Sequence, residues 1–166
     1  MNFPRPPWDE ATIRQYFSRP ELAPGYSRLL GFEFVDVDTT AMTFECTFNP
    51  GPELCSPAGA IQGGFITAML DDTMSLAAIS ALGFDGVVPT LEMKTSFLAP
   101  VMAGFVRAKG QVLKKGRKTF FTEGRLWDRE GQLLAHATAT CIHRPHDKVK
   151  AARARQARGE NSRSSE

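Results

Sequence analysis

Residues 63–82, GGFITAMLDDTMSLAAISAL, decide the fold, because they predict one long helix opened by a pair of glycines. Their apolar residues go right round the helix axis rather than forming one stripe, so we expect the helix to be buried on most sides. Two adjacent carboxylates, Asp71 and Asp72, lie in its middle. Carboxylates are rarely buried unless they are paired, hydrogen-bonded or used in chemistry. This helix is therefore the first place to look for function.

Strands are predicted on both sides of this helix. Alternating apolar and polar residues predict two strands before it and four after it, at residues 31–37, 41–48, 88–97, 105–113, 119–127 and 133–142. Short turns follow the last four strands, so we expect these four to be antiparallel neighbours in chain order. The predicted fold class is α+β, with an antiparallel sheet of about six strands wrapped around one long central helix.

The remaining chain divides into an extension and a tail. Residues 1–23 form an N-terminal extension, with a packing helix predicted at 9–19 and Asp9 as its N-cap. Residues 24–143 form the single predicted domain. Residues 144–166 carry seven basic and three acidic residues and no apolar face, so we expect a disordered tail. Because the basic excess lies in that tail, the folded part gives no case for a nucleic-acid-binding surface.

Composition indicates a cytoplasmic protein. No apolar run among the 166 residues reaches the roughly 18 residues of a membrane span, and the start, MNFPRPPWDE, lacks the basic-then-apolar pattern of a signal peptide. The three cysteines are odd in number and lack metal-site spacing. We therefore expect reduced thiols, no metal and no membrane partner.

Four segments then show a family resemblance. The four segments are residues 29–32 (LLGF), 62–71 (QGGFITAMLD), 89–100 (PTLEMKTSFLAP) and 114–117 (KKGR). Together with the predicted order of elements, they resemble the hotdog-fold acyl-CoA thioesterases of the PaaI type over residues 24–143. They match, in order, that family's first strand, its glycine-pair-then-Asp signature, its T-x6-F-L-x-P strand and the turn before its fifth strand.

Two positions depart from the family pattern. Gln62 stands where the family usually has a histidine, and Ser56 stands where it often has an asparagine. Gln62 can form hydrogen bonds but cannot carry a proton at neutral pH. We therefore expect Gln62 to orient groups rather than to transfer protons.

The resemblance implies hydrolysis of an acyl-CoA thioester without a metal or redox cofactor, with coenzyme A entering only as part of the substrate. It implies that the Gly63 amide holds the thioester carbonyl and that Asp71 is the general base or nucleophile. It also implies that Thr90 orients the attacking water. The phosphates of coenzyme A would meet the turn formed by Lys114, Lys115, Gly116, Arg117 and Lys118.

One geometric constraint follows from the helix alone. Gly63 and Asp71 are eight residues apart, or about 12 Å along a helix, which is too far for both to serve one carbonyl. They can share a site only if they come from different helices. We therefore expect a homo-oligomer in which Gly63 of one copy faces Asp71 of another, as a dimer or, as the family suggests, a dimer of dimers.

Structural alternatives exist for each of these residues. Asp71 could be a buried carboxylate satisfied by Thr67 or Ser75, four residues away on either side. Asp72, about 100° further round the helix, suits a structural or interface charge. Thr90 could be an ordinary strand residue, and the charged turn could simply be solvated.

Other functions are open at this stage. A hotdog protein that binds acyl-CoA without turnover fits the departures at Gln62 and Ser56. An interaction module would use the buried acid only to stabilise the dimer. A hotdog dehydratase or hydratase ranks lower, because it needs a histidine and an acid together, and His136, His143 and His146 all lie far along the chain from this helix.

Overall fold

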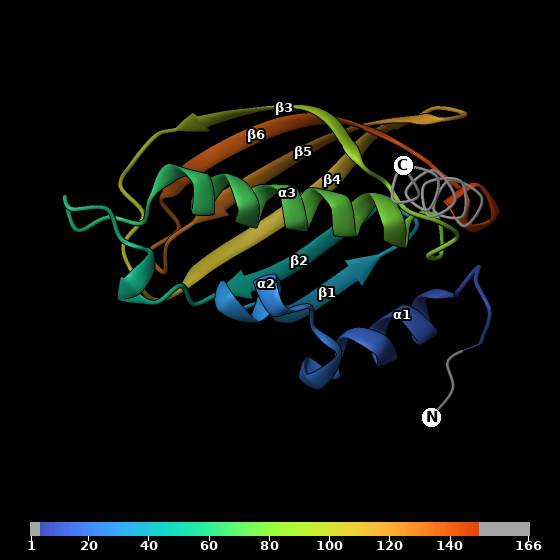
Figure 1. The fold of residues 1–166 in the computed structure, drawn as a ribbon, viewed down its shortest axis with the longest axis horizontal. Helices are drawn as coiled ribbons and strands as arrows, with labels where there is room; N and C mark the ends of the chain where they lie inside the picture. Colours follow the sequence, from blue (N-terminus) through green and yellow to red (C-terminus); the bar gives the residue numbers. More distant parts are fainter. Residues whose placement is uncertain (1–3, 150–166) are drawn as a thin grey trace, which may run out of the picture.

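The computed structural model describes residues 4–149. One six-stranded sheet lies behind a long central helix (Figure 1). The helices are α1 (Glu10–Phe17), α2 (Gly25–Leu29) and α3 (Gly63–Ser80), and the strands are β1 (Glu33–Asp38), β2 (Thr43–Phe48), β3 (Thr90–Phe97), β4 (Val106–Lys115), β5 (Thr119–Trp127) and β6 (Leu133–Ile142). The predicted α+β fold is confirmed. The prediction of a disordered tail falls largely on residues 150–166, outside the described residues.

The strand order differs from the predicted one at β3. The sheet runs β1-β2-β4-β5-β6-β3, with every neighbouring pair antiparallel. β3 pairs with β6, so the expectation that the last four strands are neighbours in chain order is wrong for this strand. The segment after β3 bonds first to Leu134 of β6 and ends with the Gly104 N–H on the Pro50 carbonyl, just after β2. It therefore crosses the sheet instead of making a tight turn.

α3 packs very closely on the middle of the sheet. Gly110 of β4 and Gly124 of β5 are cross-strand partners beneath it. A Cβ atom on Gly110 would lie 2.5 Å from the Thr73 carbonyl oxygen, and one on Gly124 would lie 2.8 Å from Met74 Cγ. Gly110 thus lets the helix backbone approach β4, and Gly124 makes room for the Met74 and Leu70 side chains. Met69, Leu70, Thr73 and Met74 are fully buried as a result.

The opposite side of α3 is less covered than the sequence predicts. Gly64 is exposed, and Ala68, Asp71, Ser75 and Ile79 are only half-buried. These five positions follow the i, i+4, i+7 spacing of one helix stripe. A single chain therefore leaves one stripe of its central helix without a full cover.

The N-terminal extension packs beside β1. Asp9 caps α1 by accepting a hydrogen bond from the Thr12 amide at 2.8 Å, as expected for the predicted packing helix. The Phe17 ring stacks on Phe34 of β1, with centroids 5.5 Å apart, and meets Phe44 of β2 edge-on. α1 and α2 lie at the β1 edge, whereas β3 forms the opposite edge (Figure 1).

The close approach of α3 gives a first prediction. Gly110→Ala should lower the free energy of unfolding by about 1–3 kcal/mol or more, because its Cβ meets helix backbone that cannot rotate away. Gly25→Ala is the matched control, since the nearest atom to its Cβ is 3.9 Å away. Urea denaturation of both variants measures the difference. Equal midpoints for Gly110→Ala and the wild type would show that the strand glycine does not set the helix position.

Candidate active site

The N-terminus of α3 offers a free amide. Gln62 is the N-cap, and its side-chain Oε1 accepts a hydrogen bond from the Gly64 N–H at 2.7 Å. The carbonyl of Gln62 accepts from the Phe65 amide. Within residues 4–149, no group accepts a hydrogen bond from the Gly63 N–H. This donor lies at the positive end of the helix dipole, where a developing negative charge is stabilised.

A cavity of about 440 Å³ lies beside that amide. The ring of Phe97 lies against Gly63, with its Cζ 3.2 Å from where a Cβ would stand. Phe97 is 54% exposed and Leu98 is 57% exposed. The cavity walls come from the loop before α3, from the first turn of α3 and from the segment that follows β3, at Ala60, Ile61, Gly63, Ile66, Phe97, Leu98, Ala99, Pro100 and Val101.

Asp71 lies on the flank of α3 that faces β3. Its Oδ1 accepts a hydrogen bond from the Thr90 hydroxyl at 2.8 Å. The structural alternative that Thr67 satisfies Asp71 is wrong for this conformation, because the Thr67 hydroxyl bonds Thr95 of β3 instead. Asp71 is half-buried, so its carboxylate keeps access to the surface. Two hydroxyl contacts thus fix α3 against the edge strand.

Asp72 lies on the other flank and is tied to α2. Its side chain is only 6% exposed. It accepts hydrogen bonds from the Tyr26 hydroxyl at 2.9 Å and from the Ser27 hydroxyl at 3.2 Å. Burial raises the pKa of Asp72 above its ordinary value of 3.8 and outweighs these two hydrogen bonds, which act in the opposite direction. Asp72 therefore joins the N-terminal extension to the central helix.

The charged turn lies at the far end of α3. Lys115 Nζ donates a 2.8 Å hydrogen bond to the carbonyl of Ala81, the C-cap of the helix. A cation suits this position, because it meets the negative end of the helix dipole. Lys114, Arg117 and Lys118 are exposed. Gly116 shapes the turn by donating its N–H to the Thr119 carbonyl at 2.8 Å.

One chain brings some of these residues together and keeps others apart. Asp71 and Thr90 are in direct contact. Gly63 lies about 12 Å further along the same helix from Asp71, and the charged turn lies at the end opposite Gly63. Within one chain, Gly63 and Asp71 are therefore too far apart to act on the same carbonyl.

The three histidines have partners of their own. His136 lies 3.7 Å from Glu123 on the sheet, and His143 and His146 bond backbone carbonyls after α3. In residues 4–149, no group of three or more His, Cys, Asp or Glu side chains is arranged to hold a metal. No helix in that range is long and apolar enough to cross a membrane.

Comparison with known proteins places the chain in a family. The model of the thioesterase superfamily matches residues 58–135. A phenylacetic acid degradation-related protein of Ralstonia eutropha JMP134, described as a candidate thioesterase, is 34% identical in sequence. The match covers 76% of this chain and 98% of that protein, with a TM-score of 0.71. The chain belongs to the thioesterase superfamily. The predicted resemblance and the predicted hotdog fold are thereby confirmed.

Two other proteins resemble this thioesterase superfamily chain, one in sequence over about half of its length and one in fold. A candidate esterase of Saccharolobus solfataricus is 34% identical over 85 residues, which are 51% of this chain; the chain spans 60% of the length of that curated relative. A protein of Streptococcus mutans UA159, solved with acetyl CoA bound, is 21% identical, with a TM-score of 0.63 and coverage of 69% of this chain and 89% of its own. At that identity, the second likeness shows the fold alone.

Sequence reasoning missed the partners of Asp72. Tyr26 and Ser27 lie in α2, whose five residues are too few to show helical periodicity. The available signal was indirect: a buried carboxylate needs donors, and Tyr26 and Ser27 offer two adjacent hydroxyls just before β1. The contact between Thr90 and Asp71 likewise needs the position of β3, which the chain order does not give.

The burial of Asp72 gives a second prediction. Because its pKa is raised in the folded state, the folded chain binds more protons than the unfolded chain between the ordinary pKa of 3.8 and the raised value. The free energy of unfolding of the wild type should therefore fall, relative to Asp72→Asn, as pH rises through that window, and the difference should then level off. Urea denaturation from pH 4 to pH 8 measures it, with Asp147→Asn at an exposed site as the control. If the free energy of unfolding of the wild type instead increased relative to that of Asp72→Asn as pH rises, the raised pKa of Asp72 would be contradicted.

Proposed function

We propose that this protein hydrolyses acyl-CoA thioesters with Asp71 as the general base. The observation that carries the proposal is the arrangement of Asp71 itself. It is a half-buried carboxylate held by Thr90, on the stripe of α3 that its own chain leaves uncovered. Membership of the thioesterase superfamily supports the same chemistry.

The reaction follows from the groups available. Thr90 donates to Oδ1 of Asp71 and leaves Oδ2 free to accept a proton from water. The water oxygen attacks the thioester carbon, and the negative charge that forms on the carbonyl oxygen is stabilised by the Gly63 N–H. The carbon–sulfur bond then breaks, and the coenzyme A thiolate takes the proton from Asp71. The products are a free acid and coenzyme A.

Two copies of the chain complete this site in the proposal. β3 is an edge strand whose outer backbone groups have no strand partner in the described chain. Apolar side chains on and after it are exposed, among them Leu91 at 62% and Met102 at 60%. A second copy placed along β3, with its α3 antiparallel, would bring Gly63 of one copy to Asp71 of the other. A dimer of dimers could be built from such pairs.

Coenzyme A would bind through the charged turn. A relative of the same fold, from Streptococcus mutans, was solved with acetyl CoA bound. In this chain, Lys114, Arg117 and Lys118 are exposed cations on one turn, a composition that suits phosphate groups. Lys115 is instead engaged with the end of α3.

Binding without turnover is the second candidate, and one observation favours it. The Gln62 Oε1 is used by its own helix as an N-cap, and the side-chain amide cannot carry a proton at neutral pH. Proton transfer then rests on Asp71 alone. A dehydratase fits less well, because His136, His143 and His146 have other partners in the described structure.

The third prediction concerns the base. Asp71→Asn should lower turnover of acyl-CoA by about 10²–10⁴-fold, because the amide cannot accept a proton from water. Thiol release from a panel of aromatic, short and long acyl-CoAs measures it. Asp72→Asn is the control carboxylate on the opposite flank and should cost much less. Turnover near wild type for Asp71→Asn would remove Asp71 as the base, and no turnover of any member by the wild type would favour the binding protein.

The fourth prediction concerns the oxyanion donor. Gly63→Pro removes the amide hydrogen at the first residue of α3, where proline is accepted, and the Gln62 backbone (φ −64°, ψ 138°) suits a following proline. It should lower kcat by about 10²–10³-fold. Gly63→Ala keeps the N–H and is the matched control.

A mixed oligomer tests whether the site is shared. In an oligomer that contains both variants, the Asp71→Asn chain still supplies Gly63 and the Gly63→Pro chain still supplies Asp71. Because each proposed site takes one residue from each copy, some sites in the mixture contain both native residues. Such mixtures should regain activity that neither parent has. Failure to regain any, with exchange of subunits shown by mass, would place both residues in one chain's own site.

The fifth prediction concerns the turn. Alanine at Lys114, Arg117 and Lys118 together should raise KM for acyl-CoA at least about tenfold with little change in kcat, because phosphate contacts are made equally in ground and transition states. Lys115→Ala should instead lower the urea midpoint, since it removes the contact with Ala81. An unchanged KM in the triple variant would exclude the turn from coenzyme A binding.

A further inference from the structure

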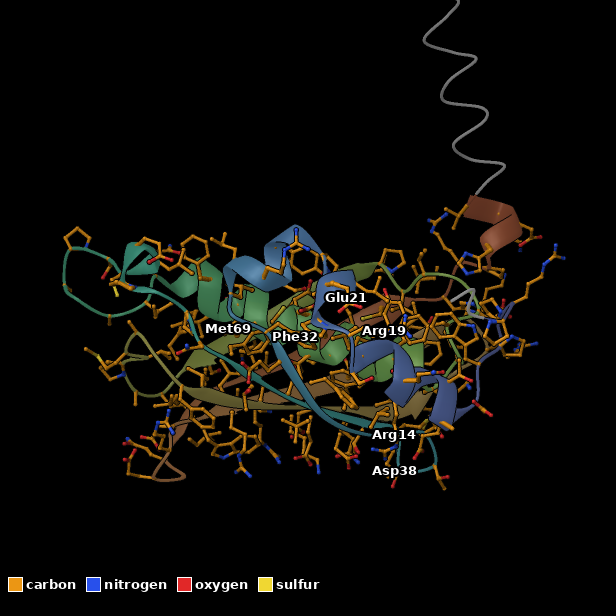
Figure 2. All side chains as sticks on the ribbon, turned by 90° about the horizontal axis from the view of Figure 1, so that it is seen from below. Arg14, Arg19, Glu21, Phe32, Asp38 and Met69 are labelled. Atoms are coloured by element: carbon orange, nitrogen blue, oxygen red, sulfur yellow. The ribbon has the colours of Figure 1, made fainter. Side chains whose placement is uncertain are left out.

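The N-terminal extension covers a cavity on the β1 flank of α3. Its volume is about 470 Å³, which lies in the range of small-molecule sites. α1, α2 and the chain between them line one side, and β1 and the middle of α3 line the other. Leu22 and Tyr26 in its lining are 39% and 55% exposed, so the cavity opens to solvent. Figure 2 looks onto this side, with α1 and α2 in front of α3 and with Phe32 and Arg19 between them.

Aromatic rings dominate the walls. Tyr16, Phe17, Phe32, Phe34 and Phe84 all line the cavity, and they contact one another. Phe17 stacks on Phe34, and its centroid lies 5.8 Å from that of Phe84. These contacts hold the rings as a firm surface for an apolar or flat ligand body. Aromatic faces also attract cations.

One buried carboxylate, at one place in the lining, offers the cavity a hydrogen-bond acceptor. Asp72 lines it and is only 6% exposed. Each of its two oxygens accepts one hydrogen bond, from Tyr26 or from Ser27. A carboxylate oxygen has two acceptor positions, so a donor on a ligand could still bind there. The other charged residues in the lining, Arg19 and Glu33, are of opposite sign and leave the wall with one formal negative charge in excess.

This cavity is separate from the candidate active site. Asp71 and Asp72 are consecutive residues, so their side chains leave α3 about 100° apart. Asp71 meets β3, whereas Asp72 meets α2. β1 and β3 form opposite edges of the sheet. A second copy along β3 would therefore leave the cavity open.

We propose that this cavity is a second ligand site, which takes a small molecule with an apolar body and one hydrogen-bond-donating end, either an ammonium or a hydroxyl group. The body lies against the aromatic wall, and the donor binds Asp72. This site does not depend on thioester hydrolysis. This second site is supported by the cavity, its aromatic wall and the Asp72 carboxylate, whose acceptor positions are only partly used.

A matched set of probes tests the proposal on the full-length protein. The probes are 3-phenylpropylamine, 3-phenylpropan-1-ol and 3-phenylpropanoate, which share one body and differ in the end group. Isothermal titration calorimetry should show binding of the amine or the alcohol, and at least about tenfold weaker binding of the carboxylate, because Asp72 offers acceptors and negative charge. The ratio of amine to alcohol affinity tells whether charge or hydrogen bonding dominates. Binding of none of the three, or strongest binding of the carboxylate, overturns the proposal.

Variants locate the probe. Asp72→Asn should weaken the preferred probe at least about tenfold, whereas Asp71→Asn should leave it unchanged. Ala23→Phe should block the cavity, with Ala103→Phe at an exposed loop position as the control. Circular dichroism confirms that each variant is folded.

Trp8 fluorescence reports binding independently, because the Trp8 ring stacks on Phe84 with centroids 4.9 Å apart. In a Trp127→Phe background, this fluorescence should change when the probe binds. Loss of binding in Asp71→Asn, or competition by coenzyme A, would assign the probe to the thioester site and overturn a second site.

Discussion

The close contact of α3 with a pair of strand glycines governs the rest of the structure. Gly110 faces the backbone of Thr73 and Met74, and Gly124 faces the side chains of Met74 and Leu70, so the helix packs directly on β4 and β5. This closeness leaves no freedom to roll the helix about its axis, because large buried side chains on either side of the contact hold it. Each side chain of α3 therefore leaves the helix axis in a fixed direction. That direction decides which strand or helix the side chain meets.

Fixed rotation explains how two identical neighbouring acids come to differ. Asp71 leaves the helix toward β3, meets one hydroxyl and stays half-buried. Asp72 leaves it toward α2, meets two hydroxyls and loses nearly all contact with water. Burial raises the pKa of Asp72, whereas Asp71 keeps access to the surface at the open stripe. Position around the helix, not residue type, therefore decides that Asp71 faces the candidate active site and that Asp72 faces α2 and the second cavity.

Much of this fold can be predicted from the sequence, and the limits have physical causes. The long apolar run after the glycine pair predicted α3, and the alternation of apolar and polar residues predicted all six strands. These patterns could not place β3 beside β6, since strand order depends on where the segment after β3 crosses the sheet. The family resemblance pointed to Asp71, Gly63 and Thr90, and the contact between Asp71 and Thr90 is present. The donors to Asp72 and the cavity beside it were missed, because α2 is short and the cavity arises only when the extension folds back on β1.

The placement of β3 also bears on how the chain is made. β3 is synthesised before β4, β5 and β6, yet its only strand partner in the described sheet is β6. Chains leave the ribosome from the N-terminus, and contacts distant in sequence form late. Thr90 therefore has no cross-strand partner until Cys141 has been added. Until then, β3 lacks its strand partner, so the contact between Thr90 and Asp71 is assembled among the last events of biosynthesis, and a chain that stops short of β6 lacks the strand that holds β3 in the sheet.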